Sequence, residues 1–204
     1  MAPRRPKGEK TRQQILEAAK QQILSKGFTA TSMRDIAQAS GISPAAIYNH
    51  FKNKDELFDA VIDENFPGDQ ILADLQRVKT DDPRVYLRAT VRSIVETLLS
   101  REDYIRLGLI DAQERQGRSI RSLLPRMFPV FFGAYLEVKA RDGGRVLRDI
   151  PPEAVMRTLV SLVFGFVFTE YVARPTETLS LPTIDWVGAM VEIMMHGIAK
   201  PPEA

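Results

Sequence analysis

Apolar residues recur along this chain at spacings of three and four, separated by short turn sequences. The pattern is clear at Ile15, Leu16 and Ala19 and again at Val91, Ile94, Val95 and Leu98. Such spacing gathers apolar side chains on one face of an α-helix, whereas a half-buried strand alternates with a period of two. No segment shows a convincing period of two. The pattern therefore predicts an all-α protein.

Turn residues divide this pattern into separate helices. Gly27 follows the first helix, and Asp82 with Pro83 forms the capped start of a later one. Two prolines, Pro125 and Pro129, lie inside another helix and leave a bend there open. Besides two short helices described next, the predicted helices cover residues 11–26, 53–65, 69–78, 83–100, 102–116, 120–141, 151–173 and 183–199.

Two short helices joined by a glycine turn are predicted after residue 30. Thr31 and Ser32 are both suitable N-caps, and Asp35 lies three residues after Ser32, as in a capping box. Gly41 ends the first helix, because glycine adopts the left-handed conformation without strain. Ser43 caps the second helix. This order of elements is a helix-turn-helix motif.

The second helix of the motif has the surface expected of a DNA-recognition helix. Ile47 and Phe51 face inward and leave small or uncharged residues outside. Small residues let the backbone approach a groove, apolar ones meet a thymine methyl, and asparagine pairs with adenine. Tyrosine and histidine side chains can donate hydrogen bonds to DNA phosphates, and so can a lysine at the start of the next helix. The predicted DNA-binding residues are Thr31, Ser32, Arg34, Ser43, Pro44, Ala45, Ala46, Tyr48, Asn49, His50 and Lys54.

Charge is distributed unevenly and supports this interpretation. Residues 1–54 hold 10 Lys and Arg against 3 Asp and Glu, a net charge of +7 that includes a basic N-terminal arm. Residues 55–204 hold 18 against 23, a net charge of −5. A domain that merely packs, or an architectural DNA binder, has no reason for this asymmetry.

The motif resembles the DNA-binding domain of the TetR family of bacterial transcriptional regulators, over residues 15–62. One departure is Ala45, where many relatives carry glycine; alanine forms helices well, so the difference has little consequence. The residues that carry the resemblance are Ile15, Leu16, Ala19, Gly27, Phe28, Thr31, Met33, Ile36, Ala37, Gly41, Ile42, Ser43, Ile47, Tyr48, His50, Phe51, Lys54 and Leu57.

The resemblance implies two domains. A helix-turn-helix domain would cover residues 1–54, linked through a helix at about 54–65 to a helical ligand-binding and dimerisation domain at 66–204. We expect the linking helix to act as a lever that changes the spacing of the two recognition helices when a ligand binds. The family further implies a homodimer on operator DNA, most often a repressor released from a palindrome by a small apolar or amphipathic inducer.

Aromatic residues crowd two helices of the larger domain, where they either fill a core or line a ligand cavity. The resemblance favours a cavity, which would be mostly apolar with a few orienting polar groups. Asp111, Glu114 and Glu170 are candidates for those groups, although each suits a solvated or salt-bridged surface as well. The predicted ligand-binding residues are Leu98, Leu107, Ile110, Asp111, Glu114, Phe128, Phe131, Phe132, Tyr135, Phe164 and Phe168.

Residues 158–169 are apolar on every side of the predicted helix, so that helix needs two buried faces. One face can pack on its own domain, and the other on a second copy; a single-chain core is the alternative. Ser161 and Gly165 would allow close approach of helices. The predicted dimer-interface residues are Leu162, Gly165, Phe166, Thr169, Val187, Met190, Val191 and Met194.

Other classes of protein find little support. The chain has no cysteine and two histidines, His50 and His196, so no metal site is expected, and it contains no nucleophile or phosphate-loop motif. We therefore expect neither an enzyme nor a cofactor. No apolar run reaches the roughly 18 residues of a membrane span, and no apolar stretch follows Arg4 and Arg5, so neither a span nor a secretion signal is expected. The absence of cysteine fits a reducing cytoplasm.

Overall fold

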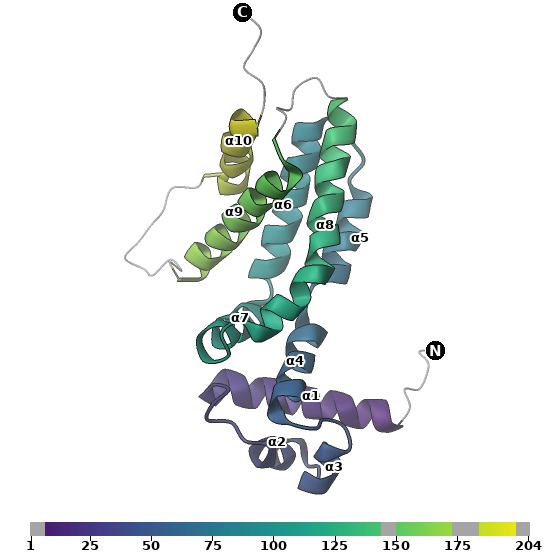
Figure 1. The fold of residues 1–204 in the computed structure, drawn as a ribbon, viewed down its shortest axis with the longest axis vertical. Coiled ribbons are helices and arrows are strands. Elements are labelled where there is room, and N and C mark those ends of the chain that lie inside the picture. Colours follow the sequence, from purple (N-terminus) through teal and green to yellow (C-terminus); the bar gives the residue numbers. More distant parts are fainter. Residues whose placement is uncertain (1–6, 144–149, 173–183, 199–204) are drawn as a thin grey trace, which may run out of the picture. The chain divides into compact units, whose positions relative to one another are not determined.

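The structure, a computed structural model, describes residues 7–143, 150–172 and 184–198 and is shown in Figure 1. These residues form helices joined by turns, without a β-strand among them, so the predicted all-α fold is confirmed. The basic arm at residues 1–6 and the predicted ends of the last helix at 183 and 199 lie outside the described residues. The helices are α1 (Lys7–Lys26), α2 (Met33–Ser40), α3 (Pro44–Tyr48), α4 (Lys54–Asn65), α5 (Gly68–Arg77), α6 (Pro83–Leu99), α7 (Glu102–Glu114), α8 (Arg118–Asp142), α9 (Pro152–Val172) and α10 (Trp186–Ile198).

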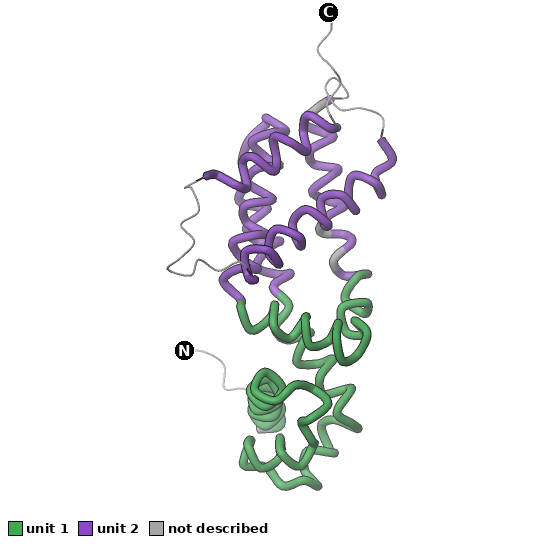
Figure 2. The backbone as a smooth tube through the Cα atoms, turned by 90° about the vertical axis from the view of Figure 1, so that its left-hand side faces the viewer, with its two compact units in different colours: residues 1–66, 102–124 green, residues 67–101, 125–204 purple. Residues whose placement is uncertain are grey.

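The chain forms two compact units, coloured separately in Figure 2. Unit 1 comprises residues 1–66 and 102–124, and unit 2 comprises residues 67–101 and 125–204. The division differs from the expected boundary, because α4, α7 and the first turns of α8 belong with the helix-turn-helix motif. Leu107 of α7 is fully buried, and α7 packs against α1 and α4. Sequence periodicity alone does not reveal which helix a given apolar face packs against.

Unit 1 is built around a core in which α1 contacts α2, α4 and α7. Each of these helices buries one apolar stripe, as helical periodicity requires. Phe28 and Phe58 meet in this core with ring centroids 5.2 Å apart. Its fully buried large side chains are Ile15, Ile23, Ile36, Ile47, Leu57, Phe58, Val61, Ile62 and Leu107.

Unit 2 is organised around α6, which packs against α5, α9 and α10. α6 begins at a capping carboxylate, since Asp82 Oδ1 accepts from the backbone N–H of Arg84 at 2.7 Å. Three ion pairs join exposed arginines of α6 to α10 and the residue before it: Arg84–Glu192 at 3.7 Å, Arg88–Glu192 at 3.0 Å and Arg92–Asp185 at 2.9 Å.

α8 is a single helix that contains both Pro125 and Pro129. Each proline removes one backbone donor from the helix. The boundary between the two units falls at Leu124–Pro125, so α8 contributes to both. Its side chains Phe131, Ala134 and Val138 are buried at helical spacing, and near its end the Arg141 guanidinium lies 4.1 Å from the ring centroid of Tyr86.

α9 is long and apolar enough to cross a membrane, judged by length and composition. No unbroken apolar run of the sequence is that long, but the helix as a whole is apolar enough on average. Core helices of soluble proteins pass the same test, which makes one such helix weak evidence for a membrane span. Only 22% of its most apolar 18-residue window is buried in the structure. Much of α9 is therefore available to a partner.

Candidate DNA-binding site and neighbouring surfaces

The first helix of the predicted motif begins and ends as its sequence indicates. Ser32 is the N-cap: its Oγ accepts from the backbone N–H of Asp35 at 3.1 Å, and the Asp35 carboxylate accepts from the Ser32 N–H at 2.9 Å. This reciprocal capping box lowers the pKa of Asp35, chiefly through the hydrogen bond from the Ser32 backbone. Gly41 ends α2 with φ of 68°, in the left-handed region.

The outward face of α3 carries small and polar side chains, and two apolar side chains are buried on its inner side. Ser43 caps it, accepting from the N–H of Ala46 at 3.2 Å, and Pro44 occupies its first position. Ile47 is fully buried, and Phe51 just after the helix is buried too. The predicted base-reading and phosphate-binding residues of this helix that lie exposed are Ser43, Pro44, Ala45, Tyr48 and Asn49, while Ala46 and His50 are half-buried.

Thr31 does not belong to this exposed surface. Its side chain is buried, and its hydroxyl donates to the carbonyl of Gly27 at 2.7 Å. The predicted DNA contact is wrong for this side chain in the structure, because the hydroxyl holds the end of α1 instead. Ser32 and Arg34 remain exposed, although the Ser32 hydroxyl also donates to Asp35. Ile42, the apolar residue of the turn between α2 and α3, is half-buried.

Lys54 also has a different environment from the one predicted. Its ammonium donates to the carbonyls of Phe28 and Thr31, both at 2.7 Å, and lies 4.3 Å from the ring centroid of Phe28. A third carbonyl, that of Thr29, is 3.3 Å away. Three carbonyls satisfy the three donors of an ammonium. The structure thus uses Lys54 to hold the loop between α1 and α2, rather than leaving it free for a phosphate.

A buried arginine joins several elements of unit 1. The side chain of Arg115, just after α7, is 3% exposed. It donates to Asp55 and Asp59 of α4, both at 2.9 Å, and to Asp111 of α7 at 3.1 Å. Its guanidinium also lies over the rings of Phe28 and Phe58, at 4.9 and 4.8 Å. A planar guanidinium suits both contacts, since it forms several directed hydrogen bonds and stacks on aromatic faces.

Two of the three carboxylates predicted to orient a ligand have structural partners instead. Asp111 is fully buried, and its oxygens accept from the backbone N–H groups of Ser119 at 3.2 Å and Ile120 at 3.0 Å. It therefore caps the start of α8, where a negative charge is favourable. Glu114 accepts from the backbone N–H of Thr29 at 2.6 Å. The expectation that these two carboxylates face a ligand does not fit these contacts.

The other predicted ligand residues fall in different environments. Leu107 and Ile110 belong to unit 1, where Leu107 is core. The remainder belong to unit 2; Leu98 and Phe131 are buried there, while Phe132 and Tyr135 are half-buried. Phe128, Phe132 and Tyr135 form a stacked row on α8, with centroids 5.6 and 6.3 Å apart. Three of the aromatic residues are largely exposed: Phe128 (51%), Phe164 (39%) and Phe168 (49%).

The exposed faces of α9 and α10 differ in part from the predicted interface. Gly165 and Thr169 are exposed, and Leu162, Phe166 and Met190 are half-buried. Val187, Val191 and Met194 are instead buried within unit 2, because α10 turns that stripe toward its own domain, where it contacts α6. The exposed stripe contains two residues that were predicted to bind the ligand, Phe164 and Phe168. Its other members had no predicted role: Val172, Trp186 and Ile193.

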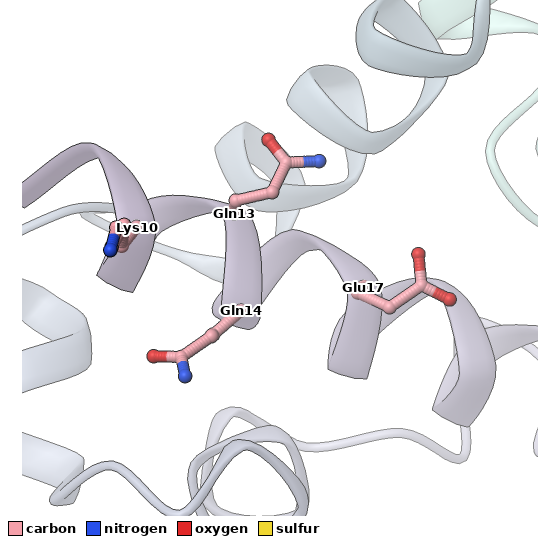
Figure 3. A pocket seen from close by; sticks show the side chains of 4 residues that line it. All are labelled: Lys10, Gln13, Gln14 and Glu17. Carbon is pink, nitrogen blue, oxygen red and sulfur yellow. The ribbon is translucent and has the colours of Figure 1, made fainter. Parts of the chain in front are cut away.

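A shallow depression of about 380 Å³ lies on α1, as Figure 3 shows. Its lining side chains are Lys10, Gln13, Gln14 and Glu17, all polar and all from one helix. A small-molecule site is usually concave and mostly apolar. This depression is wide open and lies on a single helix of unit 1, so it does not correspond to the expected ligand cavity.

Comparison with known proteins agrees with the helix-turn-helix geometry. Residues 15–61 match the sequence model of the bacterial regulatory proteins of the tetR family. The transcriptional repressor AcnR of Corynebacterium glutamicum is 27% identical over 176 residues, which cover 83% of this chain and 87% of AcnR. The chain belongs to the TetR family. It is a DNA-binding transcriptional regulator and not an enzyme.

The TetR-family likeness extends through the second unit. The crystal structure of NalD from Pseudomonas aeruginosa, described as the secondary repressor of the MexAB-OprM multidrug efflux pump, matches with a TM-score of 0.67 and 27% identity, covering 94% of this chain and 98% of NalD. The regulator TtgR of Pseudomonas putida is 45% identical, but over 55 residues that make up 27% of this chain.

Sequence reasoning missed Arg115, which is the most highly connected polar side chain described in this TetR-family protein. Two signals were available. Asp55 and Asp59 are four residues apart, and so are Asp111 and Arg115, so that each pair lies on one face of its helix. Nothing in the sequence, however, indicates that these two faces meet.

Proposed function

We propose that this regulator is a repressor that binds a palindromic operator as a homodimer and releases it when a small apolar or amphipathic molecule binds. The observation that carries the proposal is the coexistence of two uncovered surfaces. One is the exposed, uncharged face of α3, and the other is an apolar stripe along α9 and α10. A regulator that reads a palindrome needs both, one for the bases and one for its second copy.

Contact with DNA would be made by the exposed residues of α3 and its flanks. Ala45 lies where it can approach a base edge, and Asn49 supplies an amide that pairs with adenine. Tyr48, 55% exposed, and Ser43 supply hydroxyls for phosphates. Arg34 on α2 adds a cation. Lys54 is left out of this set because three carbonyls hold its ammonium.

The second copy would pack on the stripe formed by exposed residues of α9 and α10. On α9, Ser161, Gly165, Phe168 and Val172 recur at helical spacing and are all exposed. A side chain at Gly165 would meet no atom within 4 Å in this protomer, so that the surface is open. On α10, Trp186 is 42% and Ile193 72% exposed. Pairing two such stripes buries apolar area that is otherwise in water.

Ligand binding is assigned to unit 2 from its exposed aromatic row on α8. The rings of this row stack along one side of the helix: Phe128, Phe132 and Tyr135. Phe128 is 51% exposed to solvent. Aromatic surface of this kind favours an apolar or amphipathic ligand. Repression, rather than activation, is favoured by the similarity to AcnR and NalD, both described as repressors. A cytoplasmic location accompanies this function.

Selection of bound duplexes from a random pool tests the DNA part of the proposal. The expected result is an inverted repeat whose half-sites lie about one or more helical turns apart, bound at least about a thousandfold more tightly than random DNA at physiological salt. A selected sequence without twofold symmetry would contradict the palindrome and the homodimer together.

The inducer part needs a separate experiment. A library of small apolar and amphipathic molecules is screened for those that raise the melting temperature, and each hit is titrated by calorimetry with and without the selected duplex. If the inducer lowers the affinity of the protein for the duplex by some factor, linkage requires that the duplex lower the affinity for the inducer by the same factor. That factor is about 5 to 150. Hits with equal affinity in both titrations are not inducers.

A further inference from the structure

The corner between α7 and α8 is held in a defined conformation. The backbone turns there through positive φ angles at Gln116 (56°) and Gly117 (70°). Asp111 then accepts from two N–H groups of the first turn of α8, and its other contact is the guanidinium of Arg115. Because a buried carboxylate with three partners leaves little freedom, α7 and the first turn of α8 behave as one piece.

The same corner holds α4 by charged hydrogen bonds. Arg115 donates to Asp55 in the first turn of α4 and to Asp59 one turn later. Ser119, on the first turn of α8, donates to Asp59 at 2.6 Å. Charge-assisted hydrogen bonds are stronger than neutral ones, and here they contact α4 at two successive turns. Rotation of α4 against α7 would break both.

α7 is also attached to α1 and to the loop that leads into the helix-turn-helix motif. Arg106 donates to the carbonyl of Leu24 near the end of α1, at 2.9 Å. Glu114 holds the Thr29 amide, and Lys20 of α1 lies 3.8 Å from Asp103 of α7. Three separate points along α7 are therefore bonded to the DNA-binding helices.

We propose that Arg115 is a positioning residue that fixes the DNA-binding helices to α7, so that α1–α4, α7 and the start of α8 form one rigid block with and without DNA. α4 is then not a lever that turns against α7, which differs from the expectation drawn from the sequence. A signal that reaches the recognition helix α3 has to displace α7 and the first turns of α8 together with it. The proposal concerns unit 1 and does not depend on an inducer.

Locking α1 to α7 tests this block. The chain contains no cysteine, so the pair Lys20→Cys and Asp103→Cys introduces unique thiols at a partly exposed contact outside the Arg115 cluster. A short bifunctional maleimide joins them, and affinity for the duplex selected from the random pool is measured with and without the lock. If the block is rigid in both states, the affinity changes by less than about twofold. A change of tenfold or more, about 1.4 kcal/mol, shows that this joint moves on DNA binding and overturns the proposal.

Arg115→Lys supplies the second arm. It keeps the positive charge but loses the planar fork that reaches three carboxylates. Without the lock, this variant binds the selected duplex about tenfold more weakly, because α4 and α7 are no longer held; with the lock, most of that loss is restored. If the loss persists in the locked protein, or if no loss occurs, Arg115 does not act by positioning.

A matched control separates positioning from general stabilisation. The pair Arg92→Cys and Asp185→Cys joins α6 to the residue preceding α10, within unit 2, at another exposed ion pair. Cross-linking there stabilises the protein without joining α1 to α7. It should leave the Arg115→Lys defect unchanged. Rescue by this lock as well would mean that Arg115 contributes stability alone, which would overturn its positioning role.

Discussion

The carboxylate of Glu114, the last residue of α7, accepts a hydrogen bond from the backbone N–H of Thr29 at 2.6 Å, across 85 residues of sequence. Thr29 lies in the loop that leads from α1 into the helix-turn-helix motif. Burial raises the pKa of Glu114, but hydrogen bonds from Thr29 and Phe28 and the charge of Lys54 outweigh this effect, so the pKa is lowered overall.

The lowered pKa of Glu114 gives a pH-dependent contribution to stability. A depressed carboxyl pKa stabilises the folded state above the unfolded value of 4.5, and this contribution disappears as the pH falls below 4.5 through the folded value. Glu114→Gln should therefore be less stable than the wild type in urea at about pH 7, and the difference should shrink toward about pH 3. Gln113→Ala, an exposed neighbour on α7, should show no such pH dependence. A constant Glu114→Gln deficit would contradict this origin.

Removal of the Arg115 guanidinium should be among the most damaging single changes in unit 1. Arg115→Met leaves Asp111 buried without its cation, at a cost of about 3–5 kcal/mol in the free energy of unfolding. Arg118→Met removes a neighbouring arginine that is 62% exposed and 3.5 Å from Asp55, and it should cost about 0.5 kcal/mol or less. Urea unfolding measures both. Equal effects would show that the cluster contributes no more than a surface pair.

Lys54 should contribute to stability, whereas Lys52 should contribute to DNA binding. Lys54→Met removes donors to three carbonyls, so it should lower the free energy of unfolding by about 1–3 kcal/mol and leave the salt dependence of DNA binding nearly unchanged. Lys52 is exposed, and Lys52→Met should retain stability while reducing the salt slope by about one if it contacts a phosphate. A reduced slope for Lys54→Met would return that lysine to the DNA interface.

Ala45→Glu should abolish specific DNA binding without unfolding the protein. Ala45 is exposed on α3, and glutamate forms helices well, but its charge is repelled by phosphates. Fluorescence anisotropy with the selected duplex measures binding, and circular dichroism measures the fold. Glu64 is exposed on α4. The control variant Glu64→Ala removes a carboxylate there instead of adding one, and it should bind the selected duplex normally. Retained operator binding by Ala45→Glu would require another docking surface.

Gly165→Arg should convert the proposed dimer into a monomer. A Cβ built at Gly165 meets no atom within 4 Å, and Gly165 is exposed, so an arginine there can extend into solvent within one protomer and acts on the partner. A charge buried without a partner in a helix–helix interface is costly. Gly133→Arg on α8, equally free of contacts within 4 Å, should remain dimeric. Sedimentation equilibrium distinguishes the two, and an unaltered Gly165→Arg dimer would move the interface elsewhere.

Local chemistry explains why so much of the fold was predictable. The capping box at Ser32, the left-handed Gly41 and the capped, proline-initiated start of α3 depend on neighbours a few residues apart, and each forms as its sequence indicates. Helix positions elsewhere follow from apolar periodicity in the same way. Within the described residues the last helix begins at Trp186, where Asp185 Oδ1 caps it by accepting from the backbone N–H of Gly188 at 3.0 Å.

The sequence by itself therefore determined the helices, the motif and the exposed face of α3, because these depend on contacts within one or two turns. Tertiary structure alone decided which helical faces meet. It placed Asp55, Asp59 and Asp111 around Arg115, gave Lys54 and Thr31 backbone partners, and turned Val191 inward while leaving Ile193 exposed. A helix has apolar positions on more than one side, and the packing of the whole domain determines which side is buried.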